Sequence, residues 1–327
     1  MRRRHREIVH VGRDGWLFLI GGTNGVLEQY RATLSRWWRL RGWVKLIETR
    51  AARAQALGIR YLHVVVPEKL SVYDDRTVDL RYDPRQSPAR VLGRRLINNP
   101  AYVDLLSPMR AARDGPVPLY YRTDTHWNYE GCRFAYRELM RACGAVPPAD
   151  LDARQRYETT RVRDLGEKLP DKPVETASHA VLDRDAQRVY ASPLVAAYEA
   201  AGRAPDLHVG AHVCFRNDRP DIDPRTLVLF GDSYAHFAPI MLTGILAESF
   251  REVHFVWSSS IDWAYVERVK PDLLLFEMAE RFVTRLPDDT FDIATYQRGE
   301  HLAAADPVAP PVQAPEGETP EGLPVQA

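Results

Sequence analysis

The stretch Thr226-Leu227-Val228-Leu229-Phe230-Gly231-Asp232-Ser233 decides the fold. Its apolar, β-favouring run predicts a buried strand that ends in a tight turn at the glycine. An apolar, helix-like stretch from His236 to Phe250 follows, so we expect Ser233 to lie where a strand turns into a helix. This position would expose the serine hydroxyl at the carboxyl edge of a sheet. It would also direct the hydroxyl toward a helix N-terminus, whose free N–H groups can stabilise an oxyanion.

The segments that follow alternate between strand and helix patterns. Val253 to Trp257 and Leu273 to Met278 are typical of strands, and about Ile261 to Val269 is typical of a helix. Such alternation predicts a parallel sheet with helices on its faces. Ligands of such sheets bind beyond the carboxyl ends of the strands, and both Ser233 and Glu277 fall near such ends.

Upstream, further strand and helix patterns are separated by glycine and proline. The predicted elements are a turn and strand at Gly12 to Ile20, a helix from about Gln29 to Leu57, a strand at Tyr61 to Val66, a helix from Ser87-Pro88 through Ile97, a short strand at Leu119 to Arg122 and a helix from Tyr129 to Ala142. The interval of about 147–225 is the least periodic. We interpret it as an elaboration of the sheet rather than a second domain.

A serine is a poor nucleophile until a base takes its proton. In Asp124-Thr125-His126 the histidine can act as general base, and the aspartate is the nearest carboxylate able to orient the imidazole ring. Because side chains alternate along an extended segment, Asp124 and His126 would lie on one side of it. Taken singly, Ser233 could be a turn residue and His126 a hydrogen-bonded core histidine. Together, the three predict a Ser-His-Asp triad in the chain order Asp, His, Ser.

Gly231-Asp232-Ser233 combined with Asp124-Thr125-His126-Trp127 resembles the SGNH hydrolase-like domain of alginate O-acetyltransferases of the AlgX/AlgJ type. Ordinary SGNH esterases carry the serine near the start and an Asp-x-x-His block near the end. In the resembled family these blocks are permuted, as they are here. Further matches, in family order over roughly residues 10 to 286, are Gly12 to Phe18, Pro67-Glu68-Lys69 with Ser71-Val72-Tyr73, Asp164-Leu165-Gly166 with Lys168-Leu169, Pro271-Asp272 running to Glu277, and Glu280-Arg281-Phe282.

The resemblance implies an α/β fold, namely an SGNH-hydrolase-like three-layer sandwich with a mostly parallel central sheet and a circularly permuted motif order. It implies a serine-dependent O-acetyltransferase that modifies hydroxyls of an exopolysaccharide, alginate-like or another glycan, through an acetyl-enzyme intermediate. No cofactor is implied. The acetyl donor would arrive through a membrane-bound O-acyltransferase partner, in the periplasm or cell envelope.

Two other functions stay open at this point. An SGNH-type carbohydrate or acyl esterase would use the same triad, with water rather than a sugar hydroxyl as the acceptor. A non-catalytic polysaccharide-binding component of an export complex would need no triad, so the intact triad residues argue against it.

Five further residues are candidates for binding the polysaccharide: Lys69, Tyr73, Trp127, Asn128 and Tyr234. Basic and aromatic side chains beside Ser233 could form a groove that holds a sugar hydroxyl close to the acyl-enzyme. Each candidate also has a structural alternative. Lys69 could be a surface lysine and Tyr73 a packed tyrosine. Trp127 could pack beneath the histidine, and Asn128 could cap the following helix.

Four charged residues near the strand ends are interpreted as structural. We expect Asp232 to hold the nucleophile turn through its side chain. Glu277, Glu280 and Arg281 match the family block, and their simplest role is an internal ion-pair or capping arrangement.

A zinc site is the one metal hypothesis that the sequence raises. His208, His212 and Cys214 would share one face if His208 to Phe215 is a strand. Alternating residues on an ordinary strand explain the same spacing, and the sequence offers no clear fourth ligand. We therefore predict no metal site.

Composition and charge limit the classes of function and predict the domain organisation. The 327 residues are 45% hydrophobic, and Lys+Arg and Asp+Glu both number 44, so no basic bias toward nucleic acid exists. A basic extension is expected at 1–9, one catalytic domain at 10–302 and a disordered, proline-rich tail at 303–327. The basic, tryptophan-bearing helix near Arg31 to Arg53 could lie on an anionic membrane or bind an acidic polymer, although a solvated basic face is commoner.

The compartment is open at this stage. No segment approaches the ~20 apolar residues that span a bilayer, and the apolar run from Trp16 to Ile20 is shorter than the ~7–15 residues of a signal peptide. A cytoplasmic location is therefore the alternative to the envelope. Three cysteines leave at least one unpaired and do not describe a disulfide scaffold.

Overall fold

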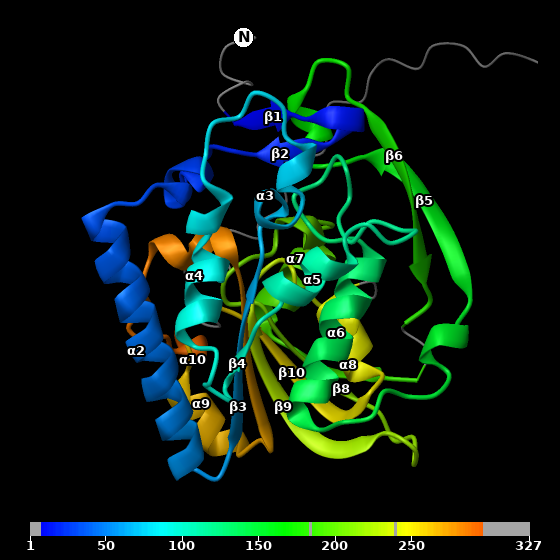
Figure 1. Ribbon diagram of the computed structural model, residues 1–327. Helices are drawn as coiled ribbons and strands as arrows, with labels where there is room; N and C mark the ends of the chain where they lie inside the picture. The colour runs from blue at the N-terminus through cyan, green and yellow to red at the C-terminus, as the bar shows by residue number, and fades with distance from the viewer. Residues whose placement is uncertain (1–7, 183–184, 239–240, 297–327) are drawn as a thin grey trace, which may run out of the picture.

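The computed structural model describes residues 8–182, 185–238 and 241–296 (Figure 1). The expected proline-rich tail at 303–327 lies outside these residues, as does most of the expected basic extension at 1–9. The domain boundaries therefore stay predictions.

A central sheet organises the fold. Within the described residues it has seven strands in the order β4-β3-β11-β9-β10-β8-β7. The first five of these are parallel, β8 runs antiparallel to β10, and β7 runs antiparallel to β8. The strands are β3 (Arg60–Val66), β4 (Tyr102–Val103), β7 (Gln187–Ala191), β8 (His212–Arg216), β9 (Asp223–Gly231), β10 (Phe250–Trp257) and β11 (Leu273–Ala279). The predicted mostly parallel sheet is confirmed.

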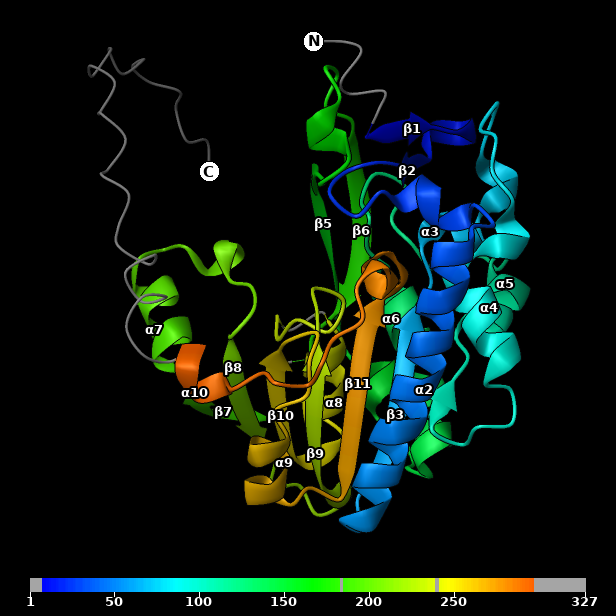
Figure 2. The ribbon, with the colours of Figure 1, turned by 90° about the vertical axis from the view of Figure 1, so that its left-hand side faces the viewer.

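Helices cover both faces of this sheet (Figures 1 and 2). On one face lie α2 (Leu34–Ala56) and α9 (Trp263–Val269), and Arg50 of α2 lies 4.1 Å from the ring centre of Phe276. On the other face lie α6 (Tyr129–Cys143) and α8 (Leu242–Ala247), where Leu139, Leu246 and Leu275 line one small cavity. Because neighbouring strand residues point to opposite faces, Leu275 and Phe276 anchor one layer each. This is the expected three-layer sandwich.

Local capping explains where several helices begin. Ser87 accepts a hydrogen bond from the Arg90 amide at the start of α4 (Pro88–Arg95), as the Ser-Pro pair predicts. Asn128 accepts one from the Gly131 amide and so caps α6, which is also as expected. The remaining short helices are α3 (Lys69–Val72), α5 (Leu106–Ala112), α7 (Pro193–Ala200) and α10 (Ile293–Tyr296).

Two predicted elements differ from the structure. The helix expected from His236 to Phe250 is only α8, because residues 233–238 form turns and bends instead of helix. The strand expected at Leu119 to Arg122 joins no sheet and makes a single bridge between Tyr120 and Trp127. Side chains bind some of the backbone groups of both segments, among them the amides of Arg122 and Tyr234.

The interval of about 147–225 elaborates the sheet in two ways. Strands β5 (Arg156–Val162) and β6 (Val174–Ala180) pair antiparallel in a separate two-stranded sheet. Strands β7 and β8 extend the main sheet along its β10 edge. A second small hairpin, β1 (Val9–Val11) with β2 (Leu17–Leu19), lies on the same side of the molecule as β5 and β6 (Figure 2).

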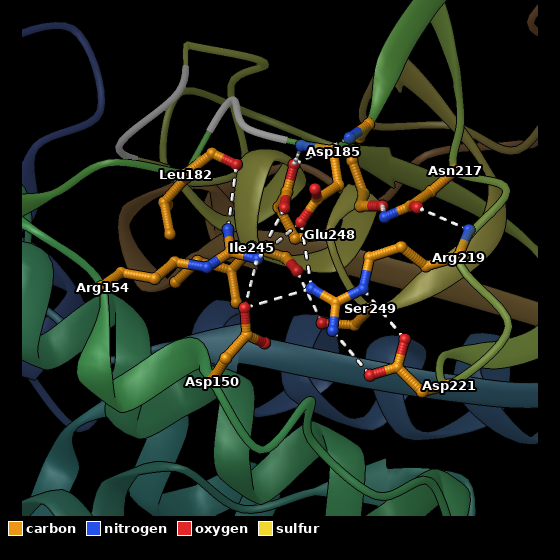
Figure 3. A network of polar contacts seen from close by, with 12 residues as sticks. Asp150, Arg154, Leu182, Asp185, Asn217, Arg219, Asp221, Ile245, Glu248 and Ser249 are labelled. Atoms are coloured by element: carbon orange, nitrogen blue, oxygen red, sulfur yellow. Dashed lines mark hydrogen bonds and ion pairs between the residues drawn. The ribbon is translucent and has the colours of Figure 1, made fainter.

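A buried ion pair ties this elaboration to the core (Figure 3). Arg154 and Glu248 lie 2.7 Å apart, and both side chains are 1% exposed. Glu248 also accepts hydrogen bonds from the amides of Asp185 and Ala186, and Arg154 donates to the Leu182 carbonyl. A buried charge that loses its partner costs far more than an exposed one. The network therefore fixes the end of α8 against the segment that leads into β7.

We expect Glu248→Ala to lower the free energy of unfolding by about 3–5 kcal/mol, because Arg154 would keep its charge in a buried position without its closest partner. Chemical denaturation with a two-state fit measures this change. The matched control is Glu199→Ala, which breaks the half-exposed Arg188–Glu199 pair and should cost about 0–1 kcal/mol. Equal losses in the two variants would contradict the role of the buried pair.

Candidate active site

Three side chains meet at the carboxyl edge of the sheet. His126 Nδ1 lies 2.7 Å from Asp124 Oδ1, and His126 Nε2 lies 2.9 Å from Ser233 Oγ. Asp124 and His126 belong to the loop before α6, and Ser233 follows the end of β9. The structure therefore brings the three predicted triad residues into one hydrogen-bonded chain, with the imidazole between the carboxylate and the hydroxyl.

The electrostatic environment of His126 suits a proton acceptor beside Ser233. Burial lowers the pKa of His126, but the hydrogen bond and the negative charge of Asp124 raise it, and the net pKa lies above its ordinary value. Burial raises the pKa of Asp124, yet the hydrogen bond from His126 and its charge hold that pKa well below the ordinary value. Asp124 is therefore an ionised carboxylate, placed to stabilise an imidazolium at His126.

The turn that carries Ser233 is fixed by carboxylates. Asp232 accepts hydrogen bonds from the amides of Tyr234 (2.9 Å) and Ala279 (2.7 Å), which confirms that it holds the turn. Its own amide donates to Glu277 Oε2 at 3.1 Å. Gly231 is required by close approach, since a Cβ there would lie 2.8 Å from the Ala235 Cβ and 2.9 Å from Glu277 Oε2.

The expected helix N-terminus does not meet Ser233. Helix α8 begins at Leu242, after an irregular segment, so its free N–H groups are not the ones next to the nucleophile. Within the described part of the chain, the Ser233 amide makes no hydrogen bond, which leaves it able to donate to an oxyanion. The sequence expectation was wrong because turn residues replace the first turns of the helix-like stretch.

Lys69 holds the backbone of the loop that carries Asp124 and His126. Its Nζ donates to the carbonyl oxygens of Tyr121 (2.8 Å), Arg122 (2.9 Å) and Asp124 (2.7 Å), and the residue is 2% exposed. Burial lowers the pKa of Lys69 to about 8, while the charge of Asp164 and other nearby carboxylates opposes this shift. All three ammonium hydrogens have partners, so Lys69 is placed to position the loop rather than to bind a sugar.

The aromatic candidates also lie beneath the triad. Tyr234 is fully buried, donates to the Thr125 carbonyl at 2.6 Å and packs against the His126 ring with 4.8 Å between ring centres. Trp127 is buried against Tyr234. Tyr73 is buried and accepts a hydrogen bond from the Leu119 amide. These positions do not form the expected groove, because the rings fill the space under the loop.

Asn128 is the one partly exposed member of the five candidates. Its Oδ1 caps α6, and its Nδ2 donates to the Pro118 carbonyl at 2.6 Å. The side chain borders a cavity of about 710 Å³ that Arg122 and Glu175 also line. The structural alternative for Asn128, a helix cap, is thus confirmed.

Two carboxylates to which the sequence assigned no role, Asp164 and Glu175, hold the same loop. Asp164 accepts from the amide and the hydroxyl of Thr125, at 2.8 and 2.6 Å. Glu175 of β6 accepts from the amides of Arg122 and Thr123, both at 2.8 Å. The signal available for Asp164 was its place in the Asp164-Leu165-Gly166 motif, whereas nothing in the sequence marks Glu175.

Glu280 and Arg281 have the internal role expected for them. Glu280 accepts hydrogen bonds from the Glu68 and Ala89 amides and from the hydroxyls of Ser71 and Ser87. Arg281 pairs with Glu68 at 3.1 Å. Glu277 is buried beneath the nucleophile turn, and burial together with the charge of Asp232 raises its pKa well above the ordinary value.

Among the described residues, two groups of three side chains could hold a metal ion. One is Asp124, His126 and Asp164, whose histidine already bridges Asp124 and Ser233. The other is His212, Cys214 and His254. His208 is not part of it, because β8 begins at His212, and His254 of β10 takes its place. The sequence missed His254 because strand pairing brings it in.

The described helices do not include one with the length and apolar character needed to cross a bilayer.

Known proteins resemble this chain in sequence and in fold. The family model of the SGNH hydrolase-like domain of acetyltransferase AlgX matches residues 9–193, which include Asp124 and His126 but end before Ser233. A curated relative from Pseudomonas fluorescens, named "Probable alginate O-acetylase AlgJ", is 26% identical over 160 residues. The match covers 47% of this chain and 38% of that protein, so the chain spans well under half of the relative's length.

Two solved structures share the fold at low identity. The O-acetyltransferase domain of Pseudomonas putida AlgJ has a TM-score of 0.54 at 18% identity, covering 88% of this chain and 98% of that one. Bacillus cereus PatB1 has a TM-score of 0.54 at 13% identity, covering 90% and 98%. These likenesses support the α/β fold over nearly the whole described chain. With the family model matching more than half of the sequence, the chain belongs to the AlgX-type family of SGNH hydrolase-like acetyltransferase domains.

Proposed function

We propose that this chain is a serine-dependent O-acetyltransferase that modifies hydroxyls of an exopolysaccharide. The observation that carries the proposal is the hydrogen-bonded chain from Asp124 through His126 to Ser233, in a member of a family of acetyltransferase domains. The relative named as an alginate O-acetylase indicates an alginate-like or other glycan as the acceptor.

The geometry supports a two-step mechanism. Ser233 Oγ attacks the acetyl carbonyl carbon while His126 Nε2, 2.9 Å away, takes the hydroxyl proton. Asp124 stabilises the resulting imidazolium, and the free Ser233 amide donates to the oxyanion. The leaving group departs with the proton from His126, which leaves an acetyl ester on Ser233. A sugar hydroxyl then attacks that ester, gives its proton to His126 and carries away the acetyl group, and the proton returns to Ser233.

A cavity of about 480 Å³ next to the nucleophile turn could receive an acceptor or donor. Asp232, Trp257, Ser258 and Asn24 are among its lining residues. An aromatic ring with nearby hydroxyl and amide groups is a suitable lining for a sugar, since it offers both a flat apolar face and hydrogen-bond partners. We assign sugar binding to this cavity, in place of the groove expected around Lys69 and Tyr234.

The cellular setting is part of the proposal and rests on family membership. In that setting a membrane-bound O-acyltransferase partner supplies the acetyl group, and the reaction takes place in the periplasm or cell envelope.

Exposure of the purified chain to an activated acetyl ester should give one acetyl adduct by intact-mass spectrometry. Ser233→Ala should abolish the adduct, because the nucleophilic oxygen is gone, while the buried control Ser71→Ala should keep it. An adduct that persists in Ser233→Ala overturns the assignment. The acetylated chain is then offered uronic-acid and neutral oligosaccharides with the partner membrane fraction present. Acetylated sugar supports transfer, whereas free acetate alone in every case supports the esterase.

The pH profile of kcat/KM on an aryl acetate should have an acidic limb above about pH 6.5, the ordinary pKa of histidine. Activity falls as the pH drops through the pKa of His126, because the base must be neutral, and Asp124 raises that pKa. In Asp124→Asn the raising charge is lost and burial remains, so the limb should move to lower pH while the rate falls about 10²–10⁴-fold. An unchanged limb would show that Asp124 does not act on His126.

Lys69→Met should lower kcat on the same ester by at least about tenfold with little change in KM. The reason is that three carbonyl groups of the triad loop would lose their common donor, so the acid and base would leave their productive geometry. Exposed Lys45→Met is the matched control and should behave as wild type. A rise in KM toward oligosaccharide acceptors with kcat unchanged would instead restore Lys69 as a substrate-binding residue.

A further inference from the structure

A second cluster of reactive side chains lies away from the triad, on the face of the sheet that α9 covers. His212 and Cys214 lie two residues apart on β8 and therefore point to the same face. His254 of β10 is the direct cross-strand partner of Cys214. Tyr265 of α9 lies over all three, with its hydroxyl 2.9 Å from His212 Nε2 and 2.5 Å from His254 Nδ1. The acetyl-transfer mechanism uses none of these groups.

The donor atoms converge on one point. Cys214 Sγ lies 3.4 Å from His212 Nε2 and 3.1 Å from His254 Nδ1, and the three ligand atoms lie within 4.8 Å of one another. Zinc binds nitrogen at about 2.0–2.1 Å and sulfur at about 2.3 Å, so tetrahedral ligands are separated by about 3.4–3.6 Å. The observed sulfur–nitrogen distances are close to these values, so the side chains need to move apart only slightly to reach tetrahedral geometry.

A second layer of contacts holds one imidazole in the state that a metal requires. His254 Nε2 lies 2.8 Å from Glu252 Oε1, and Glu252 is paired with Arg216 on β8 at 2.8 Å. With its Nε2 hydrogen donated to the carboxylate, the lone pair of His254 is on Nδ1, which is the atom that faces Cys214. A carboxylate behind a ligating histidine is the arrangement that orients metal ligands in many proteins.

The surroundings leave the cluster reachable. A cavity of about 300 Å³ is lined by His212, Cys214 and Tyr265 and is bordered by Tyr190 and Arg268.

We propose that His212 Nε2, Cys214 Sγ and His254 Nδ1 form a zinc site, with the Tyr265 oxygen or a water from the cavity in the fourth position. Binding forms the zinc–sulfur bond as the Cys214 thiol releases its proton to solvent. Two imidazoles and a thiolate are ligands that zinc prefers over magnesium or calcium. The ion would join β8, β10 and α9, and so would stabilise the antiparallel edge of the sheet beside the strand that precedes Ser233.

The test uses the untagged full chain, because a polyhistidine tag binds the same metals. After dialysis against a weak chelator, elemental analysis should find about one zinc per chain, and cobalt substitution should give a thiolate-to-cobalt charge-transfer band with the intense visible bands of four-coordination. Cys214→Ser should remove the charge-transfer band. Cys143→Ser, a buried cysteine on the opposite face of the sheet, should keep both the band and the zinc.

Glu252, which contacts the proposed ligand His254, offers a milder substitution in case Cys214→Ser does not fold. Glu252→Gln should weaken zinc binding about 10–100-fold in competition with a chromophoric chelator, with the cobalt band retained. Zinc should also raise the unfolding temperature of the wild type and not of His254→Gln, because binding to the folded state alone stabilises it.

Three results would overturn the site. They are a chain that takes up no zinc, zinc held equally well by Cys214→Ser, and binding lost in His126→Ala, which would place the ion at the Asp124, His126 and Asp164 group. Tight binding of copper(I) without binding of zinc would overturn the choice of metal. None of these readouts measures acetyl transfer, so the zinc site and the proposed function are tested independently of one another.

Discussion

The loop from Tyr121 to His126 carries Asp124 and His126 of the proposed triad but has almost no regular structure of its own. Its buried backbone groups must therefore find partners elsewhere, since an unpaired buried polar group is costly. Lys69 donates hydrogen bonds to three carbonyl groups of the loop. Glu175 and Asp164 accept hydrogen bonds from its amides. Side chains from three separate parts of the chain thus replace the hydrogen bonds of a regular strand. The hydrogen bond that Ser233 donates to His126 depends on all of them.

The same constraint shapes the other half of the site. The turn after β9 is held by Asp232, which in turn reaches the amide of Ala279 at the end of β11. Glu277 lies beneath this turn, in a position where burial favours its neutral form. Carboxylates are expensive to bury, so they persist where several N–H groups point at them. Here they fix two neighbouring strand ends to one another and hold Ser233 at the edge of the sheet.

The elaboration at 147–225 contributes to the site as well as to the sheet. It supplies Asp164 and Glu175 to the triad loop, and it anchors itself to the core through the Arg154–Glu248 pair. Its last strand, β8, carries two of the three ligands of the proposed zinc site. Side chains thereby link the antiparallel edge of the sheet to the parallel strands. Strand β10 lies between the two parts, since it pairs antiparallel with β8 and parallel with β9.

Local patterns in the sequence determined the mostly parallel sheet, the caps at Ser87 and Asn128, and the triad residues themselves. These features depend on periodicity, turn chemistry and a motif within a few residues of each position. The same patterns misjudged the segment after Ser233, where an apolar stretch forms turns before a short helix. They also placed Lys69 and Tyr234 in a groove, although both are buried. Only the tertiary structure decided that Lys69 clamps the loop, that Glu175 and Asp164 support it, and that His254 joins Cys214. Each of these contacts joins residues that are distant in sequence, and their distance is set by strand order and packing, which no local pattern encodes.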